Sequence, residues 1–179
     1  METKEIDING YSIPIYTSNY ASRLIDDRCL CVSISRTVPS WFNKPYLTLK
    51  NVQPTSDVLT TWNNSNKTTT DKIQYITNYY YSTIKRNNVD TFEDYLKGVI
   101  KLAINKSNSI IQPEKIVLLC YEAPETFCHR LILTTYLDMV MGYKILELGH
   151  DNVFQCEDAK IIRIVLTKLE QYTKGEQTK

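Results

Sequence analysis

The stretch IVLLCYEAPETFCHR, residues 116–130, joins a continuously apolar run to a short polar loop and then to a Cys-His-Arg triplet. Its first five residues, 116–120, have the length and apolar character of a strand that is covered on both faces. Residues 127–141 are apolar at helical spacing after their first turn, and this pattern stops at Gly142. We therefore predict a buried strand that leads through a loop into a helix.

The same alternation of strand and helix patterns runs along the rest of the chain. Short apolar runs predict three more strands, at residues 12–17, 29–35 and 144–148. Apolar residues at helical spacing predict three more helices, at residues 70–85, 91–106 and 158–172, and residues 60–70 read as a polar loop. This order predicts an α/β fold, a Rossmann-like three-layer domain with a mostly parallel sheet. We expect residues 1–174 to form a single α/β domain and residues 175–179 to be a disordered tail.

Composition and charge exclude several classes of protein. The 179 residues carry 21 lysines and arginines against 20 acids, and the net charge of +1 argues against bulk nucleic-acid binding. We see neither a signal peptide nor an apolar run long enough to span a membrane. Five cysteines at irregular spacing fit free thiols in a reducing compartment. We therefore expect a cytoplasmic protein with no membrane partner, and the sequence leaves its oligomeric state open.

Polar residues follow each predicted strand, where ligands of open parallel sheets bind. Ser18 and Asn19 follow the first strand and are candidate ligand contacts, although such residues more often cap a helix. Arg36 follows the second strand and could bind phosphate. Trp41 could stack on a nucleobase, and its alternative role is an anchor in the core. These four residues form the first part of the predicted ligand site.

The triplet of Cys128, His129 and Arg130 forms the second part of that site. A helix that begins near residue 126 or 127 would place the triplet in its first turn, where free N–H groups favour an anion. Arg130 could add a bidentate grip, and Cys128 should have a lowered pKa there. Adjacent helical positions diverge by about 100°, so at most two of the three share one contact. The alternative is that Cys128 packs inward while the other two bind water or nearby acids.

Glu122 completes the predicted site as a general base or as an acceptor for a sugar hydroxyl. Its alternative is a loop carboxylate paired with a nearby arginine. Cys120 ends the apolar run and more often belongs to a core. A zinc site formed by Cys120, Cys128 and His129 with Glu122 is a further alternative. No Cys-X-X-Cys pair supports it, so we predict no metal, and without a glycine-rich phosphate loop we predict no cofactor.

This combined pattern resembles the family of α/β proteins known as domain of unknown function 488. The resemblance covers roughly residues 13–148, and its most specific part is Cys-X-Glu, a proline-containing loop and Cys-His-Arg. Many members carry Asp-Val-Arg at the end of the second strand, where this chain has Ile34-Ser35-Arg36. The resemblance implies a Rossmann-like domain and raises the expectation that the triplet forms a site. It implies no established reaction.

The residues and the resemblance together predict a protein that binds a small phosphorylated ligand, such as a nucleotide or nucleoside derivative. In this hypothesis Arg36 and Arg130 hold the phosphate. Glu122, Cys128 and His129 would perform any hydrolysis or group transfer. The alternative is a non-catalytic protein of a phage or mobile element that sequesters a signalling nucleotide or binds a protein partner.

Overall fold

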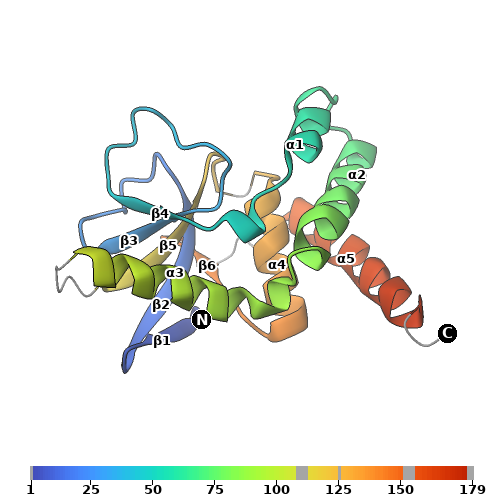
Figure 1. Cartoon of the computed structure of the whole chain (residues 1–179). Coiled ribbons are helices and arrows are strands. Elements are labelled where there is room, and N and C mark those ends of the chain that lie inside the picture. Colours follow the sequence, from blue (N-terminus) through green and yellow to red (C-terminus); the bar gives the residue numbers. More distant parts are fainter. Residues whose placement is uncertain (1, 108–112, 125, 151–155, 177–179) are drawn as a thin grey trace.

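The computed structural model describes residues 2–107, 113–124, 126–150 and 156–176. In this part of the chain, six strands form a mostly parallel sheet in the order β1-β2-β5-β3-β4, with β6 also paired to β2 (Figure 1). Among the described strands, β1 alone runs antiparallel to its neighbour. The strands are β1 (Glu5–Ile8), β2 (Tyr11–Asn19), β3 (Cys29–Ser33), β4 (Tyr46–Thr48), β5 (Lys115–Cys120) and β6 (Leu146–Glu147).

Helices alternate with the later strands and gather beside the sheet (Figure 1). Several segments are short or irregular, including a π-helical stretch that continues α2. None of the helices in the described ranges combines the length and apolar character needed to cross a bilayer. The helices are η1 (Lys50–Val52), α1 (Ser56–Asn63), α2 (Thr69–Tyr79), η2 (Tyr80–Lys85), η3 (Val89–Thr91), α3 (Phe92–Ser107), α4 (His129–Met141) and α5 (Glu157–Glu176).

The central strand β5 separates two apolar clusters. Leu118 and Cys120 belong to the larger cluster, to which α2, α3, α4 and α5 contribute their buried faces. Val117 and Leu119 belong to the smaller cluster, which is completed by loop residues and by neighbouring strands. The predicted α/β class and mostly parallel sheet are confirmed. The three-layer arrangement is not confirmed, because the described helices contribute buried residues to one cluster only.

Two segments far apart in sequence share one side of β2. β1 pairs with Tyr11 to Pro14, and β6 pairs with Tyr16 and Thr17. Between them, Lys4 N donates to Lys144 O at 2.6 Å. The chain therefore closes this side of β2 with residues from its beginning and from its last third.

The predicted elements are present, with several corrected boundaries. The predicted strand at residues 29–35 ends at residue 33, and residues 60–63 of the predicted loop belong to α1. α4 begins at His129 rather than near residue 126 or 127. α5 runs to residue 176, two residues into the predicted tail, and residues 177–179 lie outside the described residues.

The sequence analysis missed the hairpin formed by β1 and β2. Asn9 and Gly10 both have positive φ, 56° and 85°, as a two-residue turn of type I′ requires. The residues of β1 alternate, with Ile6 and Ile8 buried and two acids exposed. An Asn-Gly pair between alternating residues predicts a hairpin, but the two acids interrupt the apolar run by which the other strands were recognised.

Two glycines should respond in opposite directions to alanine. Gly142 ends α4 with φ 66°, and its N–H donates to Asp138 O at 3.1 Å. Gly142→Ala should lower the free energy of unfolding by about 1 kcal/mol, because a side chain disfavours the left-handed region. Gly98 lies on the exposed side of α3 with open space around it, so Gly98→Ala should raise that free energy by up to about 1 kcal/mol. Urea unfolding of both variants measures the two signs, and equal signs would contradict the assignment of these conformations.

Candidate functional site

The carboxyl ends of β2, β3 and β5 lie side by side. Asn19, the last residue of β2, pairs with Cys120, the last residue of β5. Ser33 at the end of β3 pairs with Leu119. The polar segments singled out in the sequence therefore leave the sheet from one edge, but their side chains enter different environments.

A mostly buried cluster, here called the thiol cluster, forms where β5 leads into α4. Its members are Cys120, Glu122, Cys128 and His129, of which Glu122 is partly exposed. The Cys120 thiol donates to Glu122 Oε2 at 2.8 Å. His129 Nε2 lies 3.0 Å from Ile34 O. Because a carbonyl oxygen only accepts, we assign the ring proton to Nε2, which leaves the Nδ1 lone pair available. The three residues predicted to be catalytic therefore lie in one cluster.

Cys128 differs from the expectation of a reactive thiolate. It is the N-cap residue of α4, with extended backbone and 3% exposure. Its hydrogen bond with Cys120, together with burial, raises the pKa of Cys128 well above the usual value. The prediction of a lowered pKa is wrong, because the hydrogen bond with Cys120 and the loss of hydration on burial together outweigh the positive end of the helix. Cys128 is a neutral thiol at neutral pH.

Aromatic residues of α1, α2 and the loop before α4 pack around the thiol cluster. The Tyr79 ring lies 6.0 Å from the His129 ring, and the Tyr75 and Trp62 rings lie 5.7 and 4.8 Å from Phe127. Tyr79 is fully buried, and its hydroxyl donates to a backbone carbonyl. Burial raises the pKa of Tyr79 well above its usual value. These rings shield one side of the cluster from water.

Arg130 points into the protein and pairs with a buried carboxylate. Its side chain is 3% exposed and that of Glu147 is 1% exposed. Arg130 Nη1 lies 3.3 Å from Glu147 Oε1, close enough for an ion pair but not aligned for a hydrogen bond. Arg130 Nη2 donates to Ala123 O, and Thr17 Oγ1 donates to Glu147 at 2.8 Å. A phosphate contact from Arg130 would require this pair to separate.

The remaining predicted contacts near the sheet edge have structural partners or face solvent. Ser18 is buried in β2. Asn19 Oδ1 accepts from Ala21 N at 2.9 Å, which stabilises a turn and not the expected helix cap. Trp41 is 61% exposed, and its ring packs edge-on against Phe42. Neither Trp41 nor the two polar residues lines the pocket described next.

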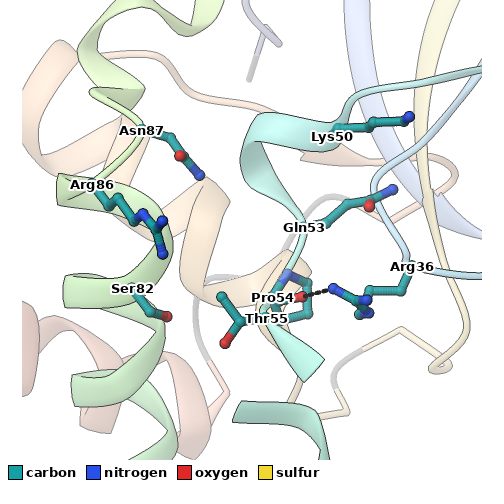
Figure 2. Close-up of a pocket in the computed structure, with 8 residues that line it drawn as sticks. All are labelled: Arg36, Lys50, Gln53, Pro54, Thr55, Ser82, Arg86 and Asn87. Carbon is teal, nitrogen blue, oxygen red and sulfur yellow. Dashed lines mark hydrogen bonds between the residues drawn. The ribbon is translucent and has the colours of Figure 1, made fainter. Parts of the chain in front are cut away.

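Arg36 lies at an open pocket of about 430 Å³, here called the Arg36–Arg86 pocket. Figure 2 shows Arg36 and Arg86 on opposite sides of Pro54 and Thr55. The pocket combines residues from the loop after β3, from the segment around η1 and from the end of η2. Its lining residues are Arg36, Lys50, Gln53, Pro54, Thr55, Ser82, Arg86 and Asn87.

The lining of the Arg36–Arg86 pocket is cationic and polar. Its described residues include three cations and no acid. Arg36 Nη1 donates to Pro54 O at 3.4 Å, whereas Lys50 and Arg86 form no ion pair within the residues that the structure describes. Ser82 Oγ is buried and has no hydrogen-bond partner among the described residues. The pocket therefore offers unneutralised positive charge and a spare hydroxyl group.

Sequence reasoning missed four residues of these environments. Glu147 had a signal, because a carboxylate within an apolar strand needs a partner. No signal in the sequence pointed to Lys50, Ser82 or Arg86, because these residues approach Arg36 only through the packing of η1 against η2. The π-helical turn that carries Ser82 also has no clear sequence signature, although such turns are frequent at functional sites.

Comparisons with protein-family models, with curated proteins and with solved structures found no match to this chain. The resemblance drawn from the Cys-X-Glu and Cys-His-Arg segments stays a prediction. In the structure, the Cys-X-Glu segment and the Cys-His pair contribute to the thiol cluster. Arg130, the last residue of the triplet, is the buried partner of Glu147. What they do is argued below from these contacts.

Proposed function

We propose that the protein binds a small phosphorylated ligand in the Arg36–Arg86 pocket. The observation that carries this proposal is a pocket that the described part of the chain lines with three cations and no acid. A phosphate group would neutralise this charge and accept hydrogen bonds from the guanidinium groups. The pocket volume of about 430 Å³ falls within the range of small-molecule sites. Nucleotides and nucleoside derivatives are the first ligands to test.

The pocket also offers groups for the rest of such a ligand. The hydroxyls of Thr55 and Ser82 lie in its lining, and Ser82 Oγ has no other partner within the described chain. The amides of Gln53 and Asn87 each donate to a backbone carbonyl, which leaves their amide oxygens to accept. These groups would bind sugar hydroxyls. None of the described lining residues is aromatic, so we propose no stacking on a base.

Binding without turnover is the version of this function that the geometry favours. Glu122, Cys128 and His129 do not line the pocket, and Cys128 is a neutral, buried thiol. General acid–base or nucleophilic catalysis requires such groups within contact of the ligand. A ligand-binding or sequestering role therefore has more support than hydrolysis or group transfer.

Arg86→Ala and Arg36→Ala should each weaken binding of a phosphorylated ligand by about 10- to 100-fold. A hydrogen bond to a charged group contributes about 1.5 to 3 kcal/mol, which corresponds to that range. Isothermal titration with inorganic phosphate, ribose 5-phosphate and adenosine monophosphate measures the change and ranks the ligand classes. Binding should also weaken at high salt, because exposed charges are screened.

Arg23→Ala is the matched control, because Arg23 is exposed and lies outside the pocket lining. It removes the same charge and should leave affinity unchanged. Equal weakening by Arg23→Ala and Arg86→Ala would show diffuse attraction and not a site. A wild-type protein that binds none of the three probes would overturn the proposal.

A further inference from the structure

Three side chains of the thiol cluster bring metal-ligating atoms together. Sulfur atoms of Cys120 and Cys128 and a carboxylate oxygen of Glu122 all lie within 4.8 Å of one another. The two thiols are buried, and Glu122 is partly exposed. Cys120 ends β5 and Cys128 caps α4, so a strand end and a helix start fix the positions of both sulfurs.

The separations are close to those of a tetrahedral metal site. Zinc–sulfur bonds of about 2.3 Å and zinc–oxygen bonds of about 2.0 Å put neighbouring ligand atoms about 3.5 to 3.8 Å apart. The three ligand atoms lie within 4.8 Å of one another, and Cys120 Sγ lies 2.8 Å from Glu122 Oε2. Small side-chain rotations would place all three atoms around one ion.

The geometry points to a Zn²⁺ site formed by Cys120, Cys128 and Glu122, with a fourth position left to water. This inference goes beyond the proposed function and does not depend on it. The zinc site considered from the sequence included His129 as a ligand. In the site inferred here, His129 is not a ligand. The sequence has no Cys-X-X-Cys motif at this site, because the fold, and not local spacing along the chain, brings the two thiols together.

Charge and chemistry favour zinc over other common cations. Two thiolates select soft or borderline metals, whereas Mg²⁺ and Ca²⁺ prefer oxygen alone. Binding replaces two thiol protons with one divalent cation, so the net charge of this buried region does not change. Neither the nearby Arg130 nor its partner Glu147 would then have to lose its charge.

His129 lies beside the ligands and would support them. Its ring nitrogens are 3.7 and 3.8 Å from Cys120 Sγ, and Nε2 is held by Ile34 O. With the ring neutral and protonated on Nε2, Nδ1 can accept a hydrogen bond from the metal-bound water. Such outer partners orient metal ligands in many sites. His129 is therefore assigned a positioning role.

The test is metal binding by the full chain, reduced and treated with a chelator. Titration with Co²⁺ should give one equivalent bound, with thiolate-to-cobalt charge-transfer absorption and visible bands of tetrahedral intensity. Zn²⁺ should displace Co²⁺ and abolish these bands. Metal uptake should release two protons per chain, measured with an indicator in weak buffer.

Cys120→Ser and Cys128→Ser should each weaken Zn²⁺ binding by more than about 100-fold. Loss of a residue that only supports a metal ligand weakens binding by up to about 100-fold, and loss of a ligand itself should weaken it more. Cys29→Ser is the matched control, because Cys29 is partly exposed, lies outside the ligand set and should leave binding unchanged. Glu122 is partly exposed, so we expect Glu122→Gln to fold. This variant should bind Zn²⁺ more weakly, and its Co²⁺ form should still show the thiolate-to-cobalt absorption. His129→Ala should keep one equivalent of metal with lower affinity. A wild-type protein without stoichiometric Co²⁺ or Zn²⁺, or equal binding by the cysteine variants, would overturn the site.

Discussion

Arg130→Ala should destabilise the protein by about 3 to 5 kcal/mol, because it leaves the carboxylate of Glu147 buried without its counter-charge. Both side chains are almost fully buried, and Thr17 supplies the hydrogen bond to Glu147 that remains. Urea unfolding measures the loss. The double variant Arg130→Met with Glu147→Gln should recover most of it, because a neutral amide keeps the bond to Thr17 and needs no cation.

The loss should depend on pH in a defined direction. Burial raises the pKa of Glu147 above its usual value, and Arg130 partly offsets that rise. A carboxyl with a raised pKa stabilises the folded state most below its ordinary value, and stability falls as pH rises through the folded-state value. Removing Arg130 raises that folded-state value further. Arg130→Ala should therefore cost less at acidic pH than at neutral pH.

Arg163→Ala is the control for the loss of an arginine from an ion pair. Arg163 pairs with Asp138, but both side chains are substantially exposed. Exposed pairs contribute about 0 to 1 kcal/mol, so this variant should lose no more than that. Equal losses of stability in the two variants, or a loss in Arg130→Ala that does not change with pH, would contradict this prediction. Either result would show that the buried pair contributes no more to stability than the exposed pair.

Leu118→Ala should lower the free energy of unfolding by about 2 to 5 kcal/mol. Leu118 lies on the central strand β5, is fully buried and belongs to the larger apolar cluster. Truncation removes buried methyl groups and leaves a cavity that flanking strands cannot fill. The slope of the urea transition should stay the same, which marks a change in stability alone.

Leu102→Ala gives the matched comparison on a helix surface. Leu102 is 62% exposed on α3, so the same truncation should change stability by no more than about 0.5 kcal/mol. If Leu118→Ala also falls within that range, β5 does not form the centre of the core. The difference between the two leucines thus tests the burial of β5 directly.

The apolar periodicity of the sequence predicted most of the framework for a physical reason. β5 is apolar at every buried position, and α4 ends at a glycine with positive φ. These signals are local, so single residues carry them. β4 was missed because it has three residues, too few for a periodic pattern.

The candidate site was harder to predict, because its properties depend on burial. Arg36 follows β3, as expected. The other two cations of its pocket, Lys50 and Arg86, come from segments that only tertiary packing brings near it. Arg130 looked like an anion contact, yet Glu147 lies against it in the interior. Cys128 lies at a helix start as expected, but its hydrogen bond with Cys120 and its burial raise its pKa instead of lowering it.

The two short segments that share one side of β2 have a consequence for aggregation. β2 has nine residues, and an uncovered strand of that length is a template to which another copy can add. β1 reaches it through a two-residue turn, so this half of the strand is covered by local contacts before the distant β6 arrives. At the opposite edge, β4 has only three residues. Within the described residues, the sheet therefore presents little free strand to a neighbouring molecule, during folding or afterwards.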